Sequence, residues 1–240
     1  MSSYQVVPLS GLQRLNADHL QRAQQEAAYA TLHAQTEVGA LEGMRARAAH
    51  DAGCPACPFV MRAVALTLRD FPRLNAQFSS EGLCIYDDVS LGLMVARRDG
   101  VLVPAVQQAG QKPASALAEE AAARTRQARD GKVHRYKQRR PTFTVIDLSG
   151  YAVDSFTPIL PAQSAGIVGV GRVKRRYRPG PDEEPRARVV QDISFTFDHR
   201  AADGLYAARF LSALVERLEQ PETLRAEEPV PKASTAPPPT

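Results

Sequence analysis

The feature that most constrains this chain is an alternating segment that passes almost directly into an amphipathic helix. Ile193, Phe195 and Phe197 alternate with polar residues, the period-two pattern of a strand with one face in a core. From residue 204 to 219 the apolar residues instead recur at helical spacing and predict a helix with one buried face. A short bend joins the two, so the chain must build a sheet with helices against it.

The remaining segments extend this mixed α/β pattern without an internal repeat. Spacing of apolar residues predicts helices at residues 12–30, 58–71 and 113–130, and strands at residues 83–86, 89–96, 101–106, 143–148, 166–177 and 189–197. Asp99-Gly100 predicts a hairpin turn, and the Pro-rich segment 178–187 predicts a loop. We therefore expect one domain over residues 1–222, followed by a Pro-rich disordered tail over residues 223–240.

Composition excludes several classes of protein. The net charge of +4 does not demand a nucleic-acid partner, although a pI near 9.1 leaves room for an anionic ligand. No apolar run approaches the roughly 20 residues of a membrane-spanning helix, and the N-terminus has no signal-peptide pattern, so a cytoplasmic protein is expected. Cys54 and Cys57 lack the further ligands of a zinc site, so we predict no metal; a redox pair is the alternative to a structural role.

His199 and Asp203 flank the bend between the last strand and the last helix. A packed histidine and a carboxylate that caps the helix would explain the two residues separately. Together, however, they form an arrangement in which a short bend can hold a neutral imidazole at the mouth of a cavity. Such an imidazole can act as a general base.

The segment FTFDHRAADG contains an HxxxDG motif, formed by His199, Asp203 and Gly204. This motif resembles the catalytic signature of the dihydrolipoamide acyltransferase cores of 2-oxoacid dehydrogenase complexes, and chloramphenicol acetyltransferases share it more distantly. Similar stretches follow in family order over about residues 5–222: VVPLSGLQRL, FPRLNAQF, YDDVSLGLMVARRDGVLVPAV, ARDGKV and DSFTPILPAQSAGIVGVGRV. The resemblance implies a chloramphenicol acetyltransferase-like two-layer sandwich of mixed β-sheet and helices, assembled as a homotrimer.

The same resemblance implies active sites at the subunit interfaces, with coenzyme A as a substrate. His199 would take the proton of a thiol, and the thiolate would attack an acyl thioester through a tetrahedral intermediate. Asp203 would be structural and held by an early arginine, for which Arg14 is the nearest match.

One departure concerns the oxyanion of that intermediate. The family usually places a hydroxyl residue on the strand FT(I/V)S, whereas this chain has Ile146 there. Loss of one oxyanion donor typically costs about 10² to 10³ in rate. Thr144 and Ser149 are the nearby hydroxyl residues that could substitute, and we rank neither first.

Other departures concern assembly and ligands. The matching region begins near Met1, so we expect no covalent lipoyl group on this chain and acyl groups from acyl-CoA or a separate lipoyl-bearing protein. Charged residues near the end of the matching region favour an isolated trimer over a cage. The basic stretch 132–140 is either a solvated loop or a site for CoA phosphates; it contains Lys132, His134, Arg135, Lys137, Arg139 and Arg140.

These observations predict an acyltransferase that moves an acyl group between CoA and a dihydrolipoyl or other thiol or hydroxyl acceptor. A noncatalytic trimeric scaffold is the alternative that Ile146 and the missing lipoyl arm suggest. A chloramphenicol-type acetyltransferase acting on a small hydroxyl compound is the third reading.

Overall fold

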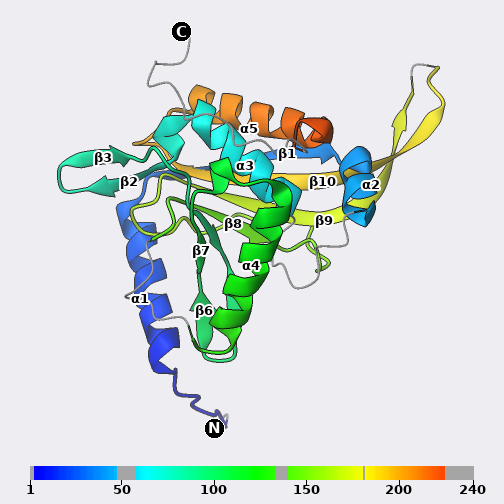
Figure 1. Ribbon diagram of the computed structural model, residues 1–240. Helices are drawn as coiled ribbons and strands as arrows, with labels where there is room; N and C mark the ends of the chain where they lie inside the picture. Colours follow the sequence, from blue (N-terminus) through cyan, green and yellow to red (C-terminus); the bar gives the residue numbers. More distant parts are fainter. Residues whose placement is uncertain (1–2, 48–57, 133–139, 181, 225–240) are drawn as a thin grey trace.

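A computed structural model describes residues 3–47, 58–132, 140–180 and 182–224. A six-stranded mixed sheet, in the order β1-β10-β9-β8-β4-β7, forms one layer, and most of the helices pack against one face of it as a second layer (Figure 1). The helices are α1 (Gly11–Glu26), α2 (Gly39–Arg47), α3 (Pro58–Asp70), α4 (Ala114–Arg129) and α5 (Gly204–Glu219). The sheet strands are β1 (Tyr29–Glu37), β4 (Leu91–Leu93), β7 (Ala105–Val106), β8 (Phe143–Asp147), β9 (Gly166–Pro179) and β10 (Pro185–Asp198). The mixed α/β architecture is thus confirmed.

Two small hairpins lie outside this sheet. The first pairs β2 (Ala76–Ser79) with β3 (Gly82–Ile85), and the second pairs β5 (Val95–Arg97) with β6 (Gly100–Leu102). Gly100 has a φ of 143°, which only glycine adopts readily, so the predicted turn at Asp99-Gly100 is confirmed. Short 3-10 turns at Pro72–Leu74, Ala109–Gln111 and Pro221–Leu224 complete the described elements.

Aromatic side chains hold β10 against α5. Phe195 and Phe210 are fully buried, with ring centroids 4.5 Å apart, and Phe143 from β8 joins the same cluster. Phe195 also stacks on Phe197 at 5.5 Å. The alternation that predicted this strand therefore corresponds to a real apolar face, and the end of β10 is held by the main core.

Strands β9 and β10 form a long antiparallel hairpin that projects beyond the body of the molecule (Figure 1). Its register shifts once: Val173 faces Gln191, but Val170 faces Ile193, so β9 contains one extra residue at Gly171 and Arg172. This is a β-bulge. We call the residues before it in β9 and their partners the inner half, and residues 173–191 the outer ribbon.

The structure differs from the sequence-based expectation in several places. The expected strands 89–96 and 101–106 are each divided between the main sheet and the β5–β6 hairpin. The helix expected at residues 12–30 ends at Glu26, and Tyr29–Glu37 forms a strand that pairs with β10 along its whole length. The expected loop at residues 178–187 is mostly strand, because the hairpin continues to Pro179 and resumes at Pro185. In these last two places, long-range pairing overrides local composition.

At the C-terminal end, ordered structure continues to Leu224, which is fully buried, two residues past the expected domain boundary. The rest of the expected tail and the Cys54–Cys57 pair lie outside the described residues. Among the helices that the structure describes, none has the length and apolarity needed to cross a bilayer.

Candidate active site

His199 lies in the turn that directly follows β10. Its backbone N–H donates to the carbonyl of Ala28 at 2.8 Å, which ties the turn to the residue before β1. The carbonyl of Asp198 accepts from the N–H groups of Ala201 and Ala202 at 2.9 and 3.3 Å. The His199 side chain is exposed, with its ring 5.6 Å from that of Phe197. Backbone hydrogen bonds therefore hold the turn, while the imidazole of His199 is exposed to solvent.

Asp203 caps the N-terminus of α5. Its carboxylate accepts a hydrogen bond from the N–H of Tyr206 at 2.8 Å, and its backbone is extended, as an N-cap requires. Gly204 begins the helix, and a Cβ there would meet no atom within 4 Å. Within one chain, the observed contacts of Asp203 support the fold of the turn and not the imidazole itself.

Arg14 lies in α1, on a different part of the molecule. This helix contacts the β5–β6 hairpin: Ser10 Oγ donates to the carbonyl of Asp99 at 2.7 Å, and Asn16 exchanges two hydrogen bonds with Val101. The structure describes both Arg14 and Asp203, and no hydrogen bond or ion pair joins them in this chain. The role of Arg14 stays a prediction.

The strand β8 carries the position where a hydroxyl was expected. Ile146 is only 6% exposed and packs with Leu160 and Ile167 on the sheet face opposite the main core. Thr144 is buried, and the N–H of Ser149 donates to Asp147 Oδ1 at 2.8 Å just after the strand. Thr144 and Ser149 therefore carry hydroxyl groups near this position, whereas the Ile146 side chain has no hydrogen-bond donor.

Strand register shows that Ile146 and His199 of one chain are far apart. Ile146 pairs with Gly169, which pairs with Ser194, four residues before the end of β10. Strand geometry then gives roughly 13 Å along the strand and about 10 Å across two strands. Thr144 lies in line with Thr196, nearer but still roughly 12 Å from the strand end by the same geometry. One chain alone does not bring an oxyanion donor from β8 to its own His199.

The two residues next to His199 in the chain form an ion pair that the sequence analysis missed. Arg200 binds the buried carboxylate of Asp198, with Nη2 to Oδ2 at 2.6 Å and Nε to Oδ1 at 3.0 Å. Hydrogen bonding to Asp198 raises the pKa of Arg200 above its usual value, so the contact favours the charged guanidinium. The alternation puts Asp198 on the polar face with Ser194 and Thr196, and the structure shows that this face is buried too, so the charge of Asp198 requires a partner.

The basic stretch 132–140 lies mostly outside the described residues. At its ends, Lys132 forms an ion pair with Asp130 at 3.5 Å, and Arg140 donates to Gln163 at 3.3 Å. His33, on β1, lies 3.0 Å from Ser194 Oγ through its Nδ1 atom. That contact is a cross-strand pair between β1 and β10.

Comparisons with known proteins agree with this geometry. Residues 1–226 match the family model for 2-oxoacid dehydrogenases acyltransferase (catalytic domain). The dihydrolipoyllysine-residue acetyltransferase component of the acetoin cleaving system of Bacillus subtilis is 29% identical over 92% of this chain. A lipoamide acyltransferase component of the branched-chain alpha-keto acid dehydrogenase complex of Pseudomonas aeruginosa is 31% identical over 92% of it. The chain spans about half the length of these relatives, 56% and 53% respectively.

Solved structures show the same fold. The dihydrolipoamide acetyltransferase of Azotobacter vinelandii superposes with a TM-score of 0.85 at 27% identity, covering 92% of this chain and 94% of that one. A chloramphenicol acetyltransferase superposes with a TM-score of 0.53 at 14% identity, over 90% of this chain and 98% of that one, which confirms the expected fold class. The protein therefore belongs to the 2-oxoacid dehydrogenase acyltransferase family and carries its catalytic-domain fold.

Proposed function

We propose that this protein transfers acyl groups between coenzyme A and a thiol acceptor, with His199 as the general base. The observation that carries the proposal is the turn itself, in which an exposed imidazole follows a rigid strand and precedes a capped helix. The acetyltransferase of Azotobacter vinelandii has been investigated for catalytic roles of a serine, a histidine and an asparagine four residues after that histidine. His199 and Asp203 have the same spacing.

In the proposed reaction, an imidazole nitrogen of His199 accepts the thiol proton of coenzyme A while the sulfur attacks the acyl thioester. A new S–C bond forms, the carbonyl oxygen becomes an oxyanion, and collapse of the intermediate breaks the original C–S bond. The leaving thiolate then takes the proton from the imidazolium, so charge and atoms balance. The reverse reaction uses the same groups.

We further propose that the working site is formed between copies of the chain in a homotrimer. The register of the sheet supports this, because it separates Ile146 and Thr144 from the same chain's His199. The N-terminal segment supports it too: Tyr4, Val6 and Val7 are 88, 75 and 73% exposed and lie ahead of α1, away from the core. Apolar side chains in such a segment suit burial against another subunit. We expect sedimentation to give three times the 26.1 kDa chain mass, whereas a monomer, or a cage of many trimers, would contradict the isolated trimer.

The proposal is tested by replacing His199 with Ala. General-base catalysis contributes typically about 10² to 10⁴-fold, so we expect acyl transfer from acetyl-CoA to dihydrolipoamide to fall by that factor. His33→Ala is the matched control, because it removes another exposed imidazole, one that pairs with Ser194 across β1 and β10. Unchanged turnover in the His199 variant, with the control also unchanged, would eliminate His199 as the base.

The scaffold alternative rests on Ile146 and is tested by restoring a hydroxyl. We expect Ile146→Ser to increase the turnover number, by up to about 10²-fold if the missing donor limits the rate. Ile146→Ala creates a similar cavity without a hydroxyl and should give no increase. A scaffold would show no turnover in any of these variants. It need not bind coenzyme A in calorimetry, whereas an acyltransferase should.

The acyl donor is also open to test. We propose that a separate lipoyl-bearing protein or free acyl-CoA supplies the acyl group. Assays with free dihydrolipoamide and with an isolated lipoyl domain separate the two sources by their specificity constants. Acetylation of small alcohols, with neither thiol accepted, would support the chloramphenicol-type reading instead.

A further inference from the structure

The residues before and after His199, Asp198 and Arg200, bind each other through their side chains. Asp198 precedes His199, and its side chain is only 1% exposed. Among the described residues, its carboxylate accepts hydrogen bonds from Arg200: the backbone N–H and Nε donate to Oδ1 at 3.0 Å, and Nη2 donates to Oδ2 at 2.6 Å. The backbone of His199 therefore lies inside a small ring that is completed by an ion pair.

Arg200 also contacts an aromatic ring through its guanidinium. Its guanidinium carbon lies 4.2 Å from the centroid of the Phe78 ring, on the β2–β3 hairpin. One residue further on, the carbonyl of Ala201 accepts from Arg73 Nε at 2.7 Å. A cation over an aromatic face is favourable, and it restricts the long Arg side chain. The small hairpin thus fixes the ion pair, which in turn fixes the turn.

We propose that Asp198, Arg200 and Phe78 are positioning residues that aim the imidazole of His199. This inference rests on the proposed role of His199 as the base. The side chains of Asp198 and Arg200 bind each other, whereas the ring of His199 lies 5.6 Å from that of Phe197, whose side chain is on the opposite face of β10 from that of Asp198. A general base must lie within hydrogen-bonding reach of the proton it takes, and a misplacement of 1 Å can cost about 10²-fold in rate. Holding both neighbours of His199 limits such displacement.

The test replaces Arg200 with Met, which keeps a long apolar chain and removes all the side-chain donors. We expect the turnover number for transfer from acetyl-CoA to fall by about 10-fold to 10²-fold, with the KM for acetyl-CoA changed less than twofold. Arg200→Lys restores one charged donor and should recover part of the loss. Phe78→Leu removes the ring but leaves the ion pair, so its turnover number should fall least.

Arg217→Met is the matched control, because Arg217 also donates to a carboxylate, that of Asp70, at 2.7 Å, but far along α5 from the turn. Its turnover number should not change. A crystal structure of the Arg200→Met protein gives a second readout that needs no activity, since the imidazole should be displaced from its wild-type position. An unchanged turnover number and an unmoved imidazole in the Arg200 variants would overturn the proposal.

Two further outcomes must be told apart: failure of the proposed role of His199, and failure of the Arg200→Met variant to fold. If His199→Ala keeps full activity, the proposed function fails, and the crystal structure alone then decides whether Arg200 positions the imidazole. If Arg200→Met does not fold, Arg200→Lys and Phe78→Leu carry the same comparison. If turnover number and thermal stability fall together in those variants, and the Arg217→Met control shows the same combined loss, the contacts have a purely structural role.

Discussion

The inner half and the outer ribbon of the β9–β10 hairpin share one backbone pairing pattern but have opposite surroundings. In the inner half, Phe195 and Phe197 are buried against α5 and neighbouring strands. In the outer ribbon, Tyr177 is 76% exposed, and most side chains face solvent. Ladder hydrogen bonds are common to both halves, so side-chain packing is what distinguishes them. His199 follows the packed half, where the side chains of β10 are buried.

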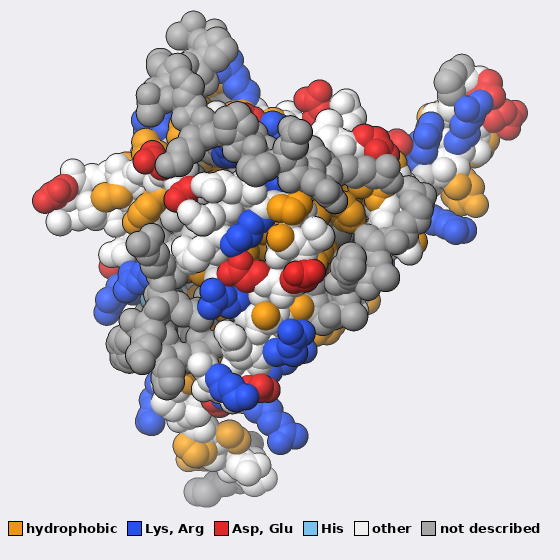
Figure 2. Space-filling model, viewed as in Figure 1, with side chains coloured by type: hydrophobic (Ala, Val, Ile, Leu, Met, Phe, Trp, Pro, Cys, Tyr) orange, Lys and Arg blue, Asp and Glu red, His pale blue; other side chains and the backbone are white. Residues whose placement is uncertain are grey.

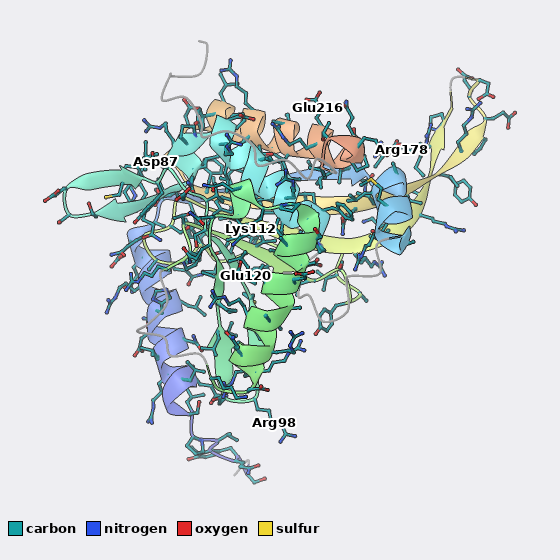
Figure 3. The ribbon with its side chains drawn as sticks, viewed as in Figure 1. Asp87, Arg98, Lys112, Glu120, Arg178 and Glu216 are labelled. Atoms are coloured by element: carbon teal, nitrogen blue, oxygen red, sulfur yellow. The ribbon has the colours of Figure 1, made fainter. Side chains whose placement is uncertain are left out.

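The outer ribbon also places like charges opposite one another. Arg176 faces Arg188 across the strands, and Arg178 faces Arg186. The carboxylate of Glu37 lies 4.0 Å from Arg178 and 3.6 Å from Arg188, and Asp182 pairs with Arg186 at 2.7 Å. Figure 2 shows basic side chains along this projection, and Figure 3 shows Arg178 near its base. Directly opposed like charges are destabilising, so the ribbon lacks the side-chain support that the inner half has.

The largest expected effect comes from removing a core ring in the inner half. Phe195→Ala should lower the free energy of unfolding by about 3–5 kcal/mol, because the cavity borders three other aromatic rings. Tyr177→Ala in the ribbon should change it by less than about 0.5 kcal/mol. Urea denaturation of both variants measures the difference. Equal losses would show that the two halves are supported alike.

A second variant acts at the junction between the halves. A Cβ on Gly171 would lie 1.7 Å from the carbonyl oxygen of Asp154, so Gly171→Ala must displace backbone. Overpacking of this kind costs typically about 1–3 kcal/mol. Gly39→Ala is the control, since its Cβ would meet Val189 at an ordinary 3.9 Å. Thermal unfolding compares the two, and equal melting temperatures would contradict the tight junction.

The cap that follows the inner half gives a smaller effect. Asp203→Ala removes the acceptor for the Tyr206 N–H and should cost about 0.5–2 kcal/mol of stability. Asp203→Asn keeps an acceptor and should cost much less, as measured by chemical denaturation. If Asn is as harmful as Ala, the negative charge itself is needed, and an arginine partner such as Arg14 becomes the better explanation.

The smallest effect is a gain in stability of the ribbon. Arg176→Glu converts a like-charge pair with Arg188 into an opposite pair, which is worth about 0.2–1 kcal/mol. Arg175→Glu is the control on the other face, where the opposing residue is Val189. Hydrogen exchange of ribbon amides should slow only in the Arg176 variant, and the gain should fade at about 1 M salt. A loss of protection would mean that Arg176 has another role.

The sequence predicted those parts of the fold whose periodicity is strong. The strand that ends at Asp198 and the helix Gly204–Glu219 are confirmed because their buried faces repeat regularly. The strand Tyr29–Glu37 was missed because it mixes Ala, Gln and Glu with few β-branched residues. Its state depends on pairing with β10, and no local property contains that information.

The candidate site was predictable to a similar extent. His199 and Asp203 follow from a motif and its place in the chain, and the capping contact of Asp203 is confirmed. The pairing of Asp198 with Arg200 depends on how tightly the turn closes, which spacing does not specify. Contacts between copies of the chain depend on surfaces that only assembly brings together, so donors to the oxyanion stay a proposal.

The bulge at Gly171 and Arg172 also decides the direction in which the ribbon's positive face points. Val170 and Val173 both turn toward the main core, although an uninterrupted strand would put them on opposite faces. The extra residue therefore inverts the phase of β9, and Arg176 and Arg178 lie on the side away from α3 and α5. Deleting Arg172 would reverse that phase. A single inserted residue thus determines on which surface of the molecule this charge lies.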